Sequence, residues 1–175
     1  MQAFASMTSD PATAFVALLR DHQRLVHRVA RSYARDHAEI EDLAQEIAAQ
    51  AWRAFPSYDS QRRFSTWLYR IALNVAISWL RVEAPRRQRS VSYEAQLHEP
   101  AIGDETDVGD GGRILGGFIE SLGALDRALL LLYLEERPLS EIAEILGLTT
   151  TNLTTKINRL KERLSRFAEK EHGTR

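Results

Sequence analysis

Residues 138–164 most restrict how this chain can fold, because a short amphipathic helix, a glycine and a longer amphipathic helix follow one another there. Gly147 is expected to take the positive φ that ends the first helix, and Thr149 or Thr150 to cap the second. The apolar residues of each helix fall on one face at helical spacing. They are Leu139, Ile142, Ala143 and Leu146 in the first helix, and Leu153, Ile157, Leu160, Leu164 and Phe167 in the second.

The opposite face of the second helix is polar. Its members are Thr150, Thr151, Thr154, Thr155, Asn158 and Arg159. Hydroxyl, amide and guanidinium groups suit phosphates and the edges of bases, and the helix order is that of a helix-turn-helix. The pattern therefore indicates DNA binding. A small helical hairpin with a solvated polar face is the alternative.

Charge is balanced over the whole chain but not along it. The 23 basic and 24 acidic residues give a net charge of −1. Between Thr149 and Lys170, however, six basic residues face two acidic ones. Phosphate contact needs only a local positive patch. The near-neutral total predicts weak non-specific DNA affinity and suggests that a partner holds the protein on DNA.

The remaining sequence predicts an all-α protein of two small helical domains. Helices are expected near 13–35, 38–54 and 64–82, and again in short pieces between 113 and the helix-turn-helix, while no stretch alternates as a strand does. Residues 84–112 hold two prolines, four glycines and six acidic residues, which predicts a flexible acidic linker. The predicted domains are 1–83 and 113–175. In the helix predicted at 38–54, the residues expected to face inward are Ile40, Leu43, Ile47, Ala51 and Trp52.

Several classes of protein are disfavoured. The chain has no cysteine, which excludes disulfides, thiol catalysis and thiolate metal sites. Its five histidines are scattered, and no Gly-rich phosphate loop is present, so no enzyme, metal or cofactor is expected. The start lacks a signal-peptide pattern, and the longest apolar run, 128–134, is too short to cross a bilayer. A cytoplasmic protein without membrane insertion is expected.

The third predicted helix has a second candidate surface. Its outward stripe consists of Trp67, Arg70, Asn74, Ser78 and Arg81, with Arg62 and Arg63 just before it. An exposed aromatic ring beside guanidinium and amide groups suits single-stranded nucleic acid, through stacking and phosphate pairing. The alternative is that Trp67 belongs half-buried to the core and the arginines are solvated.

The second predicted helix has an acidic outward face. Asp42, Gln45, Glu46 and Arg53 share it, with two carboxylates four residues apart. A catalytic pair, a metal site, a protein-contact face and a plain solvated face are the possible interpretations. Catalysis is disfavoured because no histidine lies at matching spacing on this helix.

Taken together, these segments resemble the extracytoplasmic-function (ECF) class of bacterial sigma factors. The stretch IEDLAQEIAAQAW at 40–52 is similar to the polymerase-binding helix of that family, and FSTWLYRIALNVAISWLR at 64–81 to its promoter-melting and −10-recognition helix. Residues 122–164 are similar to its −35-recognition domain. The three motifs occur in the family's order.

The resemblance implies a subunit that directs bacterial RNA polymerase to promoters. Asp42, Leu43, Gln45 and Glu46 are then expected to bind the beta-prime clamp of core polymerase. Arg62, Arg63, Trp67, Arg70, Asn74 and Arg81 are expected at the −10 DNA. Thr150, Thr151, Asn152, Thr154, Thr155, Asn158 and Arg159 are expected at the −35 DNA. An anti-sigma factor is a further possible partner, and a nucleoid-associated cytoplasmic location follows.

Two other functions remain open. A helix-turn-helix regulator that binds duplex DNA without polymerase explains 113–175, but leaves the acidic face and the exposed stripe without a role. A protein-interaction module without DNA binding is the third possibility. Co-purification with core polymerase separates the first function from the second, and DNA retention separates both from the third.

Overall fold

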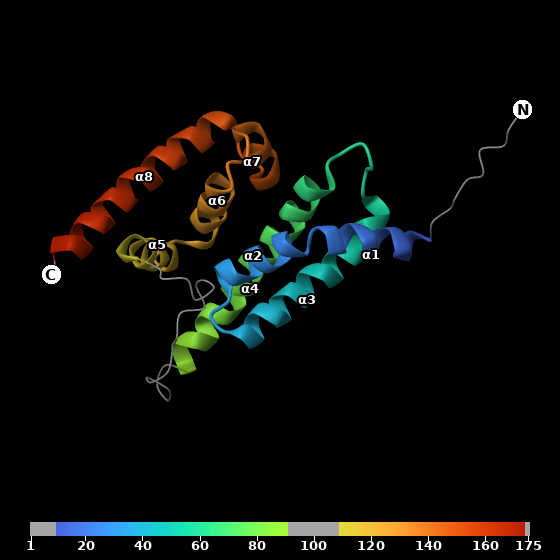
Figure 1. Cartoon of the computed structure of the whole chain (residues 1–175), viewed down its shortest axis with the longest axis horizontal. Helices are drawn as coiled ribbons and strands as arrows, with labels where there is room; N and C mark the ends of the chain where they lie inside the picture. Colours follow the sequence, from blue (N-terminus) through green and yellow to red (C-terminus); the bar gives the residue numbers. More distant parts are fainter. Residues whose placement is uncertain (1–9, 91–108, 174–175) are drawn as a thin grey trace, which may run out of the picture.

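The computed structural model describes residues 10–90 and 109–173, and all regular structure in these two stretches is helical (Figure 1). The first stretch contains α1 (Pro11–Asp21), α2 (Gln23–Tyr33), α3 (His37–Ala54), the 3-10 turn η1 (Phe55–Ser57) and α4 (Phe64–Ser90). The second contains α5 (Asp110–Glu120), α6 (Ala124–Leu134), α7 (Leu139–Leu146) and α8 (Thr150–Gly173). The prediction of an all-α fold is confirmed.

Helices α2, α3 and α4 pack against one another as the N-terminal bundle. Asp36 caps α3 by accepting a hydrogen bond from the Glu39 backbone N–H at 2.8 Å, which fixes where that helix begins. Phe15 joins α1 to the bundle because its ring packs against those of Trp52 and Phe55, each at 5.1 Å. The largest fully buried side chains of this bundle are Val29, Tyr33, Leu43, Ile47, Leu68, Tyr69 and Leu73.

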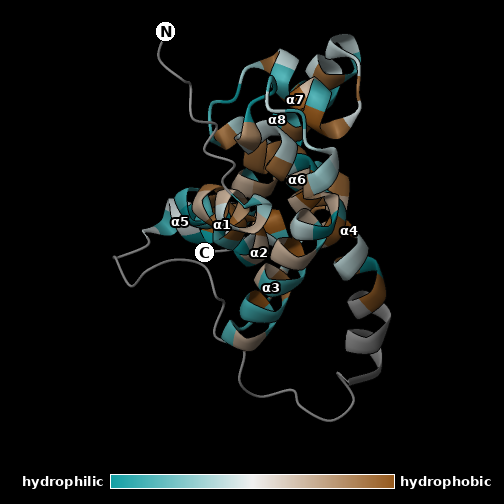
Figure 2. Cartoon of the chain, turned by 90° about the vertical axis from the view of Figure 1, so that its right-hand side faces the viewer, coloured by the Kyte–Doolittle hydropathy of each residue, from teal (hydrophilic) through white to brown (hydrophobic). Residues whose placement is uncertain are grey.

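Helices α5 to α8 form the C-terminal bundle, in which the long α8 packs against α5, α6 and α7 (Figure 1). Apolar and polar residues are interspersed along the helices (Figure 2). Among the described residues, those that are buried include no polar or charged side chain. The core consists mainly of Phe118, Leu129, Leu132, Ile142, Leu153, Ile157 and Leu160. The inward positions predicted for the middle of α8 are therefore confirmed.

The two bundles are in contact. Helix α4 packs against α6 and α7, and α2 packs against α6. The surfaces through which each bundle would meet DNA or protein are consequently divided into parts that face the other bundle and parts that face solvent.

The structure corrects the predicted helix boundaries at two places. The expected helix at 13–35 is broken at His22, whose backbone leaves helical geometry while its ring hydrogen-bonds the Leu18 carbonyl at 2.8 Å. The predicted linker 84–112 is also too long: α4 continues through Pro85 to Ser90, and α5 already begins at Asp110. The rest of that linker, 91–108, lies outside the described residues, as does the start of the chain.

Candidate nucleic-acid and protein-binding surfaces

The helix-turn-helix has the local geometry that its sequence predicts. Gly147 ends α7 with φ of 65°, in the left-handed region. Thr149 caps α8 by accepting a hydrogen bond from the Asn152 N–H at 3.2 Å. One expected inward residue differs, because Leu139, at the first position of α7, is 41% exposed. Gly147 and the Thr149 cap thus set where α7 ends and where α8 begins.

The outward face of α8 is exposed along its first three turns. Thr150, Thr151, Asn152, Thr154, Thr155, Asn158 and Arg159 are all exposed. Two of the hydroxyls are turned toward the helix itself: Thr154 donates to the Thr150 carbonyl at 3.0 Å, and Thr155 donates to the Thr151 carbonyl at 3.1 Å. Every residue predicted at the −35 DNA is therefore accessible in the first three turns of α8.

Two basic residues further along α8 are engaged within the C-terminal bundle. Lys161 lies over the Tyr133 ring at 5.1 Å, and Arg163 pairs with Asp126 at 2.9 Å. These contacts attach α8 to α6. The local excess of positive charge seen in the sequence is thus partly used for packing.

The predicted stripe on α4 is mostly accessible. Arg70, Asn74, Ser78 and Arg81 are exposed, as are Arg62 and Arg63 before the helix. Trp67 is only half-buried, because its ring packs between those of Tyr58 and Phe64, at 5.0 and 5.2 Å. Its position matches the core alternative more than the fully exposed one. Arg62 is paired across the bundles with Glu144 of α7, at 3.3 Å.

The acidic face of α3 is also accessible. Asp42 and Gln45 are exposed, while Glu46 is half-buried and accepts a hydrogen bond from Gln50 at 2.7 Å. Leu43 is fully buried, as its inward position predicts, and is not available to a partner. Trp52 was expected to face inward, but its side chain is 44% exposed. It lies one to two turns beyond Gln45 and Glu46 on the same side of the helix, so the accessible face ends in an aromatic ring.

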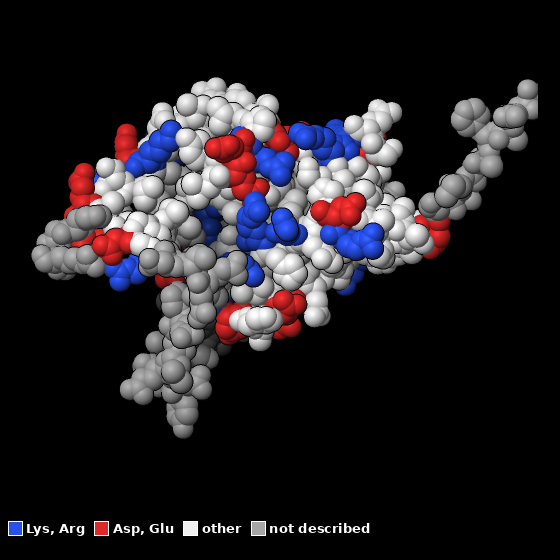
Figure 3. Space-filling model, viewed as in Figure 1, with Lys and Arg blue, Asp and Glu red and all other residues white. Residues whose placement is uncertain are grey.

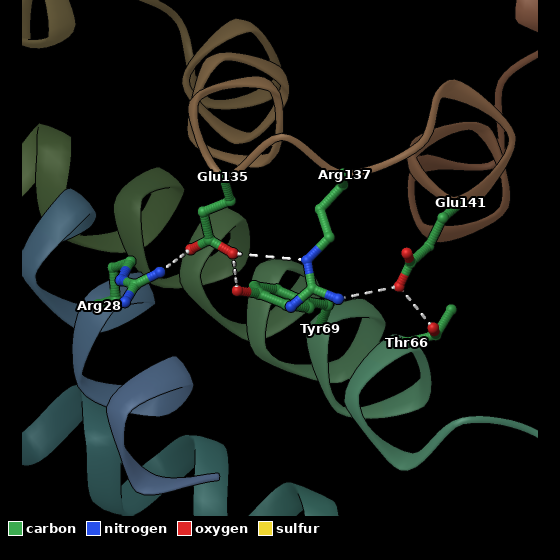
Figure 4. A network of polar contacts seen from close by, with 6 residues as sticks. All are labelled: Arg28, Thr66, Tyr69, Glu135, Arg137 and Glu141. Atoms are coloured by element: carbon green, nitrogen blue, oxygen red, sulfur yellow. Dashed lines mark hydrogen bonds and ion pairs between the residues drawn. The ribbon is translucent and has the colours of Figure 1, made fainter.

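A network of charged side chains joins the two bundles, and sequence reasoning missed it (Figure 4). The Glu135 carboxylate, just after α6, accepts a hydrogen bond from Arg28 of α2 at 2.8 Å and another from the Tyr69 hydroxyl of α4. Arg137 lies 3.6 Å from Glu135 and over the Tyr69 ring at 4.8 Å. Burial is the main cause that raises the pKa of Tyr69, and the hydrogen bond to Glu135 raises it further. The hydroxyl therefore stays protonated and can donate.

The same network continues to α7. Arg137 donates to Glu141 at 3.2 Å, and Thr66 of α4 donates to the same carboxylate oxygen at 2.7 Å (Figure 4). Tyr33 of α2 makes a further contact between the bundles by donating to the Ala124 carbonyl at 2.8 Å. Glu135 is 66 residues from Tyr69 and 107 residues from Arg28 along the chain, so no local sequence signal marks these contacts.

Three properties of the described residues bear on function. In the view of Figure 3, acidic and basic side chains are interspersed, and neither sign forms a continuous surface. Among the described residues, no group of three or more histidine, acidic or cysteine side chains is placed to hold a metal ion. None of the helices described is both long and apolar enough to cross a bilayer.

Comparison with known families matches both bundles. Residues 18–86 match the family described as Sigma-70 region 2, and residues 113–164 match Sigma-70, region 4. The two matches fall on the two bundles in the order in which the sequence predicted them.

Individual proteins are similar over most of the chain. The ECF RNA polymerase sigma factor SigW of Bacillus subtilis is 30% identical over 137 residues, which are 72% of this chain and 73% of that protein. The ECF RNA polymerase sigma factor SigM of Mycobacterium tuberculosis is 27% identical over 166 residues, 88% of this chain and 76% of that one.

Solved structures have the same fold. The sigma factor RpoE of Bartonella quintana, in complex with the anti-sigma factor NepR, superposes with a TM-score of 0.67 at 23% identity, covering 89% of this chain and 97% of that one. CnrH, in complex with the cytosolic domain of CnrY, gives a TM-score of 0.65 at 22% identity, with 92% and 91% covered. At these identities the likeness concerns the fold.

Proposed function

The chain belongs to the ECF family of bacterial RNA polymerase sigma factors, and we propose that it is a dissociable subunit that directs the polymerase to specific promoters. It regulates initiation and carries no catalytic step of its own. Helices α1 to α4 would form the polymerase-binding and −10 domain and α5 to α8 the −35 domain, with the residues between Ser90 and Asp110 as the connection. Working with polymerase on promoter DNA would place it in the cytoplasm, at the nucleoid.

Asp42, Gln45 and Glu46 would dock on the beta-prime clamp of core polymerase. Their accessibility on one side of α3, above a fully buried Leu43, supports this assignment. Leu43 would then support the surface from the core side. The exposed Trp52 adds the type of side chain that most often dominates binding energy at protein interfaces.

Arg62, Arg63, Arg70, Asn74 and Arg81 would hold the opened −10 strand. All five are exposed, and their four guanidinium groups suit the phosphates of a single-stranded backbone. Trp67 would contribute as a half-buried ring at the end of this surface. Because Arg62 pairs with Glu144, that ion pair must break before Arg62 can contact DNA.

The exposed face at the start of α8 carries the proposal for duplex DNA. Seven side chains with hydroxyl, amide or guanidinium groups are accessible in this part of the helix. The left-handed Gly147 and the Thr149 cap determine where the helix begins. The second helix of such a motif lies in the major groove. A regulator that acts without polymerase would use the same helix, but it would have no use for the α3 face.

Reconstitution with core polymerase tests the proposal. The wild-type chain should co-purify with core enzyme and retain promoter DNA in that complex. Asp42→Lys and Glu46→Lys should weaken the co-purification, because a charge contact becomes repulsive, while circular dichroism stays unchanged. Glu162→Lys, an exposed reversal on α8, is the matched control and should keep core binding. DNA retention without core binding would favour the polymerase-independent regulator.

A further inference from the structure

The state of two threonine hydroxyls on α8 bears on which bases the helix can recognise. Threonine has one hydroxyl proton to donate and one γ-methyl group. In helices its side chain divides between two rotamers, one of which places the hydroxyl against a carbonyl of the preceding turn. Thr154 and Thr155 both adopt that rotamer, with bonds of 3.0 and 3.1 Å.

This bonding changes what the two side chains offer to a ligand. The hydroxyl protons are used within the helix, so neither residue presents a donor outward. Each side chain is exposed and still offers two groups to a ligand. One is its γ-methyl group, and the other is the hydroxyl oxygen, which can still accept a hydrogen bond.

The four base pairs differ in how well they fit such a surface. Guanine presents only acceptors in the major groove, and therefore needs a donor. Thymine presents a methyl, and adenine presents an amino donor beside its acceptor. An A·T pair thus offers a partner for the methyl as well as for the free acceptor. A G·C pair offers its cytosine amino group to the acceptor, but it has no methyl, and its guanine meets no donor here.

We infer that Thr154 and Thr155 are specificity-determining residues that select A·T base pairs in the −35 element, chiefly through contact of their methyl groups with thymine methyls. The inference rests on the proposed promoter recognition by α8. Donors on this face come from other side chains, among them Thr150, Asn152 and Asn158. Guanine recognition, where it occurs, belongs to such residues.

The matched variants are Thr→Ser and Thr→Val at each position. Serine keeps the hydroxyl and lacks the methyl, while valine keeps a methyl and lacks the hydroxyl. Holoenzyme containing each variant selects from a promoter library randomised across the −35 region. Wild type and both valine variants should select A·T at the positions concerned, and the serine variants should lose that preference. Circular dichroism checks that α8 stays helical.

Replacing thymine by deoxyuridine in the selected element isolates the methyl group. Loss of one buried methyl contact should weaken wild-type binding about fourfold. The Thr→Ser variant at that position should lose nothing further. The inference would be overturned if the serine and valine variants lost the A·T preference equally, or if the wild type selected G·C pairs at these positions. Promoter recognition by α8 would remain intact in both cases. A holoenzyme that forms but retains no promoter would instead refute the proposed function.

Discussion

Glu135→Gln is expected to separate the two helical bundles without unfolding either. Its carboxylate is only 9% exposed and is contacted by Arg28, Tyr69 and Arg137. Arg28 and Tyr69 belong to the N-terminal bundle, whereas Glu135 follows α6. Glutamine has the same shape, but it removes the charge and turns an amide N–H₂ toward donors.

The expected cost follows from these contacts. Hydrogen bonds to charged groups contribute about 1.5–3 kcal/mol each where they are shielded from water. The Arg28 side chain is 52% exposed, so solvent screening reduces its share. We therefore expect Glu135→Gln to destabilise the docked arrangement of the bundles by about 2 kcal/mol. This free energy corresponds to about a 30-fold shift in the docking equilibrium of the bundles.

Fluorescence energy transfer measures this equilibrium directly. The chain has no cysteine, so dyes can be attached at Arg20→Cys and Glu162→Cys, both exposed positions on different bundles. Glu135→Gln should enlarge the low-transfer population, while helical content stays constant. Glu120→Gln, an exposed neutralisation at the end of α5, should leave the transfer unchanged. Unaltered transfer in Glu135→Gln, or a loss of helix instead of separation, would refute this account of the interface.

Two further predictions concern the backbone and DNA. Glu136 takes φ of 56° after α6, in a region that favours glycine. Glu136→Gly should therefore raise the free energy of unfolding by about 1 kcal/mol and Tm by about 2–4 °C. Gly147→Ala should lower both quantities by similar amounts, measured in the same thermal melts. A lower Tm for Glu136→Gly would mean that its side chain offsets the strain. Arg159→Ala should weaken promoter binding evenly across sequences, as loss of a phosphate contact does; loss of preference at one base, at about 1–3 kcal/mol, would identify base recognition instead.

Local signals in the sequence predicted local structure well. Gly147, Thr149 and the spacing of Leu153, Ile157 and Leu160 each act within a few residues, and each has the predicted role. The helix break at His22 had no such signal, because neither glycine nor proline occurs near it. Pro85 gave the opposite error, since α4 continues through a residue that usually ends helices.

Properties that depend on the packed structure could not be predicted in the same way. Trp52 is apolar, yet the position of α3 against α1 leaves much of its ring in solvent. The partners of Glu135 come from α2 and α4, so only the docked bundles bring them together. The outward positions of Arg70, Asn74 and Arg81 followed from helical periodicity, whereas the pairing of Arg62 with Glu144 did not.

The charges of α8 finally bear on how a chain of net charge −1 binds DNA. Lys161 and Arg163 are engaged with Tyr133 and Asp126, which leaves Lys156 and Arg159 as the cations nearest the polar face. Two neutralised phosphates correspond to a salt slope of about −2 for the isolated chain on duplex promoter DNA, with weak affinity. Tight binding must then come from engaging both bundles at once on polymerase, which raises the effective concentration of each. A steep salt slope for the free chain, measured by titration at several salt concentrations, would contradict this division of the charges.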